Sequence, residues 1–284
     1  MITVDACAKI NLTLEVLRKR ADGYHEIATV FQEIGLNDTL TFEDRPELTL
    51  ECDHPTLESD QNLAFKAANL LQQETDCRKG ALISIEKKIP VASGLGGGAS
   101  DAAATLLALN DLWKLGLSTE QLLPLASGLG SDVAFFLHGG TALGEGRGER
   151  ITTLPPFPTS WIVLFYPPVD IPSVKTKRLY DSLDASYFGE GHATKEVVDM
   201  LHRGIEISPS HLVNTFEEVA FTAYQGLEDH WQRFRELGAD NVHLAGSGPT
   251  LFTLVRDVKQ GEGIYHNLMK EGFEAYLVQS MAAR

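Results

Sequence analysis

The chain has 284 residues, of which 43% are hydrophobic, and its formal net charge is −15 at pH 7. This length exceeds the usual size of a single hydrophobic core, so two domains or one large one are expected. Nucleic acid and anionic membranes need a basic partner surface, so the acidic balance argues against both as main partners. An anionic ligand would therefore have to be held by a local site.

The three cysteines, Cys7, Cys52 and Cys77, are widely spaced and form no CxxC motif. Because this pattern supports neither a disulfide framework nor a zinc site, a reducing cytoplasm is the simplest location. No window of the sequence is long and apolar enough to span a membrane, and the N-terminus lacks the features of a signal peptide. We therefore expect a soluble, untargeted protein.

The first third of the chain is expected to contain mainly strands. Residues 2–16 predict two strands interrupted near residues 6–9, and residues 18–44 predict a turn followed by two more strands. A helix is expected in residues 60–73, where apolar residues recur with helical spacing. Residues 81–92 alternate like a strand and lead into a glycine-rich loop.

Helices are expected after this loop. Residues 101–113 are rich in strong helix formers, and Ser118 and Gln121 have the spacing of a capping box, which predicts a second helix. Turn residues then surround short apolar runs as far as residue 154. The PPFP segment at residues 155–158 is the best candidate for a domain junction.

The remainder mixes both kinds of element. We expect a strand in residues 160–167, helical segments around 176–205 and 211–236, a hairpin around a glycine turn in 241–257, and a closing strand in 273–280. Strands and helices do not alternate regularly along the chain. This order indicates an α+β protein.

The loop PVASGLGGGASD, residues 90–101, places four glycines within five positions. Glycines suit a backbone that a bulky anion approaches closely. A P-loop needs a Lys that is absent here, and a Rossmann unit needs a second strand where a second helix is expected. Two hypotheses stay open, an anion-binding nest completed by the helix N-terminus and a tight helix entry built for packing.

The extended loop PVASGLGGGASDAA resembles the phosphate-binding motif of the galactokinase, homoserine kinase, mevalonate kinase and phosphomevalonate kinase (GHMP) superfamily. Its triple glycine and trailing SDAA are most similar to the 4-diphosphocytidyl-2-C-methyl-D-erythritol kinase family of the non-mevalonate isoprenoid pathway. Five other segments resemble the same family in the same order, namely residues 8–16, 20–34, 62–71, 130–149 and 245–252.

This resemblance implies both a fold and a reaction. A ribosomal-protein-S5-like, nucleotide-binding domain at 1–154 and an α/β-plait-like domain at 155–284 would form a two-domain α+β kinase, with the active site in the cleft between them. ATP would phosphorylate the 2-hydroxyl of 4-diphosphocytidyl-2-C-methyl-D-erythritol directly. Mg²⁺ would be held mainly by ATP phosphates and water. The enzyme would act in the cytoplasm as a monomer or homodimer.

Two residues are implied to carry the chemistry. Asp132 resembles the family's general base, although an Asp after Gly-Ser is more often a helix cap. Lys9 would pair with Asp132 and lower the pKa of the substrate hydroxyl, although by itself it is typical of an edge-strand lysine that reaches water. The chain departs from the family at Ala134, where Pro is common, and at Ala99, where Ser is common.

The other implied site residues form three groups. The substrate group, expected around the cytosine, is Asn11, Tyr24, His25, Thr176 and Tyr180. The third motif is a glycine turn that braces the phosphate loop or is simply a hairpin turn, and it contains Gly246, Ser247 and Gly248. The ATP-binding group is Pro90, Val91, Ala92, Ser93, Gly94, Leu95, Gly96, Gly97, Gly98, Ala99, Ser100, Asn62 and Lys87. Asn62 and Lys87 have structural alternatives, a helix cap and a solvated lysine.

Two other functions fit the same motifs. One is a GHMP kinase of homoserine or mevalonate type, and Tyr24 and His25 argue against it because such a substrate carries no base to recognise. The other is a catalytically silent nucleotide-binding protein, against which Lys9 and Asp132 argue together.

Overall fold

The computed structural model describes residues 1–172 and 174–283. The chain divides into two compact units. The first consists of Met1–Ala8, Leu36–Val91 and Gly96–Gly139, and the second of Lys9–Gly35, Ala92–Leu95 and Gly140–Arg284. The chain passes from one unit to the other within its first two strands and within the glycine loop. The domain boundary between residues 154 and 155 stays a prediction.

The first two strands are long and continuous. They are β1 (Ile2–Lys19) and β2 (His25–Arg45). The predicted interruption near residues 6–9 is wrong, as is the division of residues 25–45 into two strands. Every residue from 6 to 16 is buried, so the alternation that marks a half-buried strand is lost in the middle of β1.

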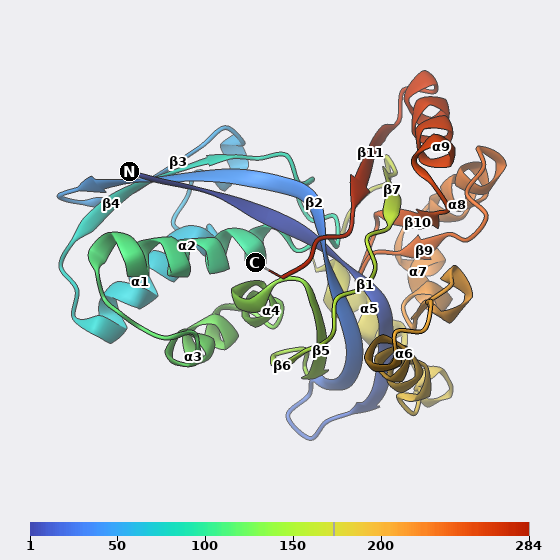
Figure 1. The fold of residues 1–284 in the computed structure, drawn as a ribbon, viewed down its shortest axis with the longest axis horizontal. Coiled ribbons are helices and arrows are strands. Elements are labelled where there is room, and N and C mark those ends of the chain that lie inside the picture. Colours follow the sequence, from blue (N-terminus) through green and yellow to red (C-terminus); the bar gives the residue numbers. More distant parts are fainter. Residues whose placement is uncertain (173, 284) are drawn as a thin grey trace. The chain divides into compact units, whose positions relative to one another are not determined.

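In the first unit a small sheet is covered by helices. Residues 39–45 of β2 pair antiparallel with β4 (Gly80–Glu86), which pairs parallel with β3 (Leu48–Cys52). Figure 1 shows α1 and α2 side by side along one face of these strands. The helices of this unit are α1 (Leu63–Thr75), α2 (Gly97–Trp113), α3 (Thr119–Leu129) and α4 (Val133–His138), with a 3-10 turn at Pro55–Leu57.

Small residues let the helices of the first unit pack closely. The buried face of α1 consists of Ala64, Ala67, Ala68 and Leu71. The capping box of α3 is present, with the Ser118 amide donating to Gln121 Oε1 at 2.9 Å, which confirms that prediction. The predicted helix at 101–113 is confirmed, but α2 begins four residues earlier, at Gly97.

The second unit contains an antiparallel sheet in the order β11-β7-β10-β9. Its strands are β7 (Trp161–Tyr166), β9 (His243–Leu244), β10 (Leu251–Val255) and β11 (Glu274–Gln279). The predicted hairpin is confirmed, because β9 and β10 pair antiparallel on either side of the glycine turn. Helix α9 (Val258–Lys270) packs against β11, β7 and β10 (Figure 1).

The remaining strands of this unit belong to the sheet that contains the long strands. β5 (Thr141–Gly146) pairs antiparallel with residues 27–32 of β2 and with β6 (Arg150–Thr153), and β8 (Val213–Asn214) pairs parallel with β1. The other helices are α5 (Lys175–Ser182), α6 (His192–Arg203), α7 (Glu217–Ala223) and α8 (Leu227–Glu236), with 3-10 turns at Ala185–Tyr187 and Pro209–His211.

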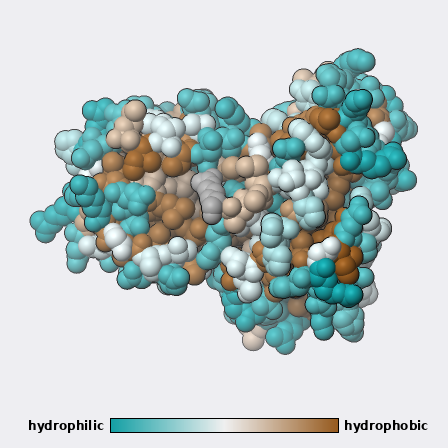
Figure 2. Space-filling model, in the orientation of Figure 1, coloured by the Kyte–Doolittle hydropathy of each residue, from teal (hydrophilic) through white to brown (hydrophobic). Residues whose placement is uncertain are grey.

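Four aromatic side chains lie among the aliphatic residues in the core of the second unit. Phe165, Phe216, Tyr224 and Phe234 are all at most 2% exposed. Hydrophilic residues cover much of the visible face of the molecule, as expected of a strongly acidic chain (Figure 2). In the described part of the chain, no helix is long and apolar enough to cross a membrane. Cys7, Cys52 and Cys77 form no disulfide with one another.

Candidate active site

The glycine loop has an unusual backbone. Ala92, Gly94 and Gly96 have φ values of 55°, 90° and 78°, all in the left-handed region that favours glycine. Gly96 is the N-cap of α2, so residues 97–99 fall in the first helical turn. First-turn amides have no acceptor inside the helix and point outward from its positive end. The loop therefore ends in an arrangement suited to bind phosphate.

Close packing accounts for two of the four glycines. A Cβ at Gly94 would lie 2.1 Å from the Ala245 carbonyl oxygen, and one at Gly97 would lie 3.0 Å from Ile89 Cγ2. Gly98 is different, because its nearest neighbour would be an ordinary 3.6 Å away and the residue is exposed. Packing and anion binding thus each explain part of the glycine pattern.

Lys87 belongs to a buried ion-pair triad. Its Nζ lies 2.5 Å from Asp38 Oδ2 and 2.7 Å from Asp101 Oδ2, and the three side chains are 7%, 0% and 3% exposed. Asp38 Oδ1 also accepts hydrogen bonds from the amides of Lys88 and Ile89. The alternative of a solvated lysine is wrong. The triad ties β2 to the residues on both sides of the glycine loop.

The triad has one carboxylate more than it has cations. The pKa of Asp101 is raised to about 7, mainly because burial disfavours its charged form; Lys87 lowers this pKa and the nearby Asp38 raises it. Asp101 Oδ1 is buried and has no hydrogen-bond partner among the described residues. Because this oxygen is desolvated, the ionised carboxylate is disfavoured, and Asp101 keeps its proton at pH values where an exposed Asp would be ionised.

The free energy of unfolding should consequently fall as the pH rises from 3.8 to about 7. Between the ordinary Asp value of 3.8 and about 7, folded Asp101 holds a proton that the unfolded chain releases. The free energy of unfolding then decreases with pH, by at most about 1.4 kcal/mol per unit. Urea unfolding of the wild type and of Asp101→Asn at several pH values should give a difference that changes over this window. Parallel pH profiles would contradict the assignment.

Asn62 caps a helix. Its Oδ1 accepts from the amide of Ala64 at 2.9 Å, and its Nδ2 donates to the carbonyl of Leu57 at 3.0 Å. The structural alternative considered for this residue is confirmed. A contact to ATP stays a prediction.

Asp132 occupies the N-cap position of α4, but its side chain makes no capping hydrogen bond. The residue is half-buried. Helix capping by the carboxylate was the main alternative to a catalytic role, and the structure does not show it.

Lys9 is buried in the second unit, with 3% of its surface exposed. Its Nζ donates to Asn11 Oδ1 at 2.9 Å, and Asn11 Nδ2 donates to Thr29 Oγ1 at 2.7 Å. The same ammonium would lie 2.8 Å from a Cβ placed on Gly246. The edge-strand alternative is wrong, and three predicted site residues, Lys9, Asn11 and Gly246, are brought together.

Two residues that sequence reasoning missed support the third motif. Asn214 Nδ2 donates to the carbonyls of Leu244 and Gly246, each at 2.8 Å. The Tyr224 hydroxyl donates to the Ser247 carbonyl at 2.5 Å. Neither residue stands in a recognisable motif, so nothing in the sequence pointed to them.

His25 stacks on Tyr180, with ring centroids 4.6 Å apart and an interplanar angle of 9°. Burial lowers the pKa of His25, and the charge of Lys19 lowers it further, so the neutral imidazole dominates at neutral pH. Tyr24 is 56% exposed, with the Arg147 guanidinium carbon 4.8 Å from its ring centre. The stacked pair of rings is thus formed by His25 and Tyr180, whereas the ring of Tyr24 lies beside Arg147.

Thr176 lies at the start of α5, where its hydroxyl donates to Ser247 Oγ at 3.1 Å. A substrate-group residue is therefore joined to the third motif. The preceding residue, Lys175, was not predicted to belong to the site, yet it contacts two of the predicted turns.

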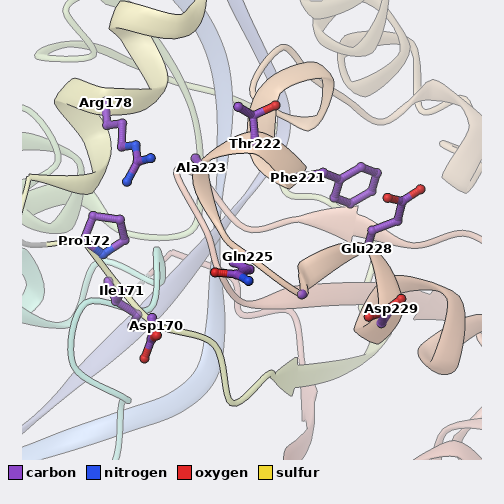
Figure 3. Close-up of a pocket in the computed structure, with 11 residues that line it drawn as sticks. Asp170, Ile171, Pro172, Arg178, Phe221, Thr222, Ala223, Gln225, Glu228 and Asp229 are labelled. Carbon is purple, nitrogen blue, oxygen red and sulfur yellow. The ribbon is translucent and has the colours of Figure 1, made fainter.

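A cavity of about 620 Å³ opens on the second unit. Figure 3 shows Arg178 from α5 on one side of it and Glu228 and Asp229 from α8 on the other. The predicted site residues lie outside its lining. Among the described residues, no group of three or more His, Cys, Asp or Glu side chains is arranged to hold a metal ion.

Comparison with known proteins identifies the family. The GHMP kinases N terminal domain matches residues 62–140, and the GHMP kinases C terminal domain matches residues 193–275. A 4-diphosphocytidyl-2-C-methyl-D-erythritol kinase of Dehalococcoides mccartyi is 42% identical over 281 residues, which are 99% of each chain.

Solved structures agree with this similarity. A crystal structure of 4-(cytidine 5'-diphospho)-2C-methyl-D-erythritol kinase is 34% identical, covers 98% of this chain and 99% of its own, and has a TM-score of 0.83. A homoserine kinase from Cytophaga hutchinsonii is 18% identical over 99% and 95% of the chains, with a TM-score of 0.73, and so shares the fold alone. The chain belongs to the 4-diphosphocytidyl-2-C-methyl-D-erythritol kinase family of the GHMP kinases.

Proposed function

We propose that the protein transfers the γ-phosphate of ATP to the 2-hydroxyl of 4-diphosphocytidyl-2-C-methyl-D-erythritol. The observation that carries the kinase assignment is the left-handed glycine turn that opens into the N-terminus of α2. Phosphoryl transfer mainly requires that the donor phosphates be held and their charge compensated. Similarity to relatives of that name over 99% of the chain supports the choice of substrate.

The glycine loop is proposed to hold the ATP phosphates. Amides of the first turn of α2 would donate to phosphate oxygens, and the exposed Gly98 leaves room for them. Magnesium bound to ATP would compensate phosphate charge. Because Mg²⁺ usually keeps several water ligands, ATP oxygens and water would be enough to hold it without a cluster of protein carboxylates. The chain's own residues would position the phosphates and handle the proton.

Asp132 and Lys9 are proposed to act on the attacking hydroxyl. Asp132 would accept its proton while the hydroxyl oxygen forms a bond to the γ-phosphorus and the bond from that phosphorus to the bridging oxygen of ADP breaks. The buried ammonium of Lys9, oriented by Asn11, would stabilise the developing negative charge. No covalent enzyme intermediate is needed.

His25 and Tyr180 are proposed to receive the cytosine. Their rings are already in contact at 4.6 Å, so the base would stack on an outer face of the pair. A neutral imidazole offers both a donor and an acceptor to the edge of a base. This arrangement favours a nucleotide-bearing alcohol over homoserine or mevalonate.

His25→Ala should weaken binding of the cytidylated alcohol selectively. Loss of one stacking partner costs about 1–3 kcal/mol per base, which corresponds to a KM for the alcohol raised about 5- to 150-fold. The KM for ATP should change by less than about twofold, as should both values in His192→Ala, an exposed control in the same unit. An equal rise in both KM values for His25→Ala would contradict a role in base recognition.

The reaction itself is tested by its product. ATP labelled at the γ-phosphorus is incubated with the protein and the cytidylated alcohol, and phosphorus NMR locates the new phosphate ester. The proposal expects the ester at the 2-hydroxyl and unlabelled protein. A phosphoprotein intermediate or an ester at another hydroxyl would overturn the corresponding step. We expect the reaction to take place in the cytoplasm.

A further inference from the structure

The glycine loop and the third-motif turn, residues 246–248, contact each other through their backbones. The Thr250 amide donates to the Ser93 carbonyl at 3.2 Å. A Cβ on Gly94 would lie 2.1 Å from the Ala245 carbonyl oxygen and 2.8 Å from the Gly248 nitrogen. The close packing of the two turns therefore depends on the backbone conformation of both.

Lys175, the first residue of α5, bridges these two turns. Its ammonium donates to the carbonyl of Ala92 at 2.6 Å and also to the carbonyl of Gly248. One side chain thus holds one carbonyl from the glycine loop and one from the third motif. Both bonds have a charged donor, which makes them stronger than bonds between neutral groups.

The backbone of Ala92 has an unfavourable conformation that needs contacts to stabilise it. Ala92 has a φ of 55°, a conformation that costs free energy for any residue with a Cβ and persists only where surrounding contacts impose it. In a trans peptide the carbonyl and the following N–H point in opposite directions. Turning the Ala92 carbonyl toward Lys175 consequently fixes the direction of the Ser93 amide.

The same helix carries two of the predicted substrate residues. Thr176 donates to Ser247 Oγ at 3.1 Å, and Tyr180 stacks on His25 at 4.6 Å. Because these residues share one short helix with Lys175, the position of the stacked pair is mechanically linked to the backbone of the glycine loop.

We propose that Lys175 is a positioning residue for phosphoryl transfer, which sets the backbone of the glycine loop and couples that loop to the helix bearing Thr176 and Tyr180. The inference rests on the proposed function, because it takes the loop to be the site of the ATP phosphates. Lys175 touches no reacting atom and acts through Ala92 and Gly248.

Lys175→Met is the test, and Lys177→Met is its matched control on the same helix. Lys177 pairs with Asp181 across an exposed surface, with Nζ and Oδ2 2.6 Å apart. We expect Lys175→Met to raise the KM for ATP by on the order of 10–100-fold, as loss of an orienting partner commonly does, while the thermal midpoint stays that of the control. Lys175→Arg, which retains a charged donor, should have a KM for ATP close to that of the wild type.

Calorimetric binding of a non-hydrolysable ATP analogue separates this inference from the proposed reaction. If the wild type binds the analogue but phosphorylates no cytidylated alcohol, the substrate assignment fails, and the affinities of the two Met variants still decide the role of Lys175. Equal affinities and equal KM values for those variants would overturn the inference. A lowered thermal midpoint in Lys175→Met, without rescue by Lys175→Arg, would also overturn it, because the role would then be only structural.

Discussion

Replacing Asp132 with Asn is expected to lower kcat by about 10²–10⁴-fold while ATP still binds, because a positioned general base contributes an acceleration of that size. The side chain is half-buried and makes no capping hydrogen bond to α4, so an isosteric amide should leave the helix intact. Steady-state turnover and titration with an ATP analogue measure the two quantities separately.

Asp111→Asn provides the control for this variant. Asp111 is an exposed residue of α2 in the same unit, and its loss should leave kcat within about twofold of the wild type. If Asp132→Asn retained kcat near that of the control, the proton would have to go elsewhere and the proposed role of Asp132 would be wrong.

Lys87→Met is expected to lower the free energy of unfolding by about 3–5 kcal/mol, since it leaves buried carboxylates without their cation. Asp38 and Asp101 are 0% and 3% exposed, so water cannot replace the ammonium. Urea unfolding near pH 8, where Asp101 is expected to be ionised, measures the loss directly.

The neighbouring Lys88 supplies the control, because it is exposed. Lys88→Met should change the free energy of unfolding by less than about 0.5 kcal/mol. Combining Lys87→Met with Asp101→Asn should recover part of the loss, since only one unpaired carboxylate would remain. Equal stability of Lys87→Met and Lys88→Met would contradict the importance of the triad.

The sequence predicted those elements whose patterns are local. The capping box at Ser118 and the hairpin on either side of residues 246–248 depend on residues close together in the chain, and both are confirmed. The continuity of β1 was not predictable in the same way, because burial by distant segments removes the alternation of a half-buried strand.

Helix α9 had no predicted counterpart, and glycine explains why. Gly261 and Gly263 lower the intrinsic helix propensity of this segment. A Cβ on Gly261 would lie 2.6 Å from Leu277 Cδ1, so glycine lets α9 approach β11 closely. A residue that is unfavourable for the isolated helix is thus favourable for its packing, which only the folded structure reveals.

The candidate site was predictable where a family motif covers it and not elsewhere. Lys9, Asn11 and Gly246 come from two motifs, and the fold brings these three residues together. Asn214 and Lys175 donate to backbone carbonyls, and such contacts impose little recognisable sequence pattern. The placement of the active site between the two domains stays a prediction.

The most direct test is ADP release with Mg·ATP and 4-diphosphocytidyl-2-C-methyl-D-erythritol, measured beside homoserine and mevalonate. We predict turnover with the cytidylated alcohol, and turnover slower by on the order of 10⁴-fold with the other two, because a site built for polar recognition rejects substrates that leave its groups unpaired. Comparable turnover with homoserine or mevalonate, or none with any alcohol although ATP binds, would contradict the account.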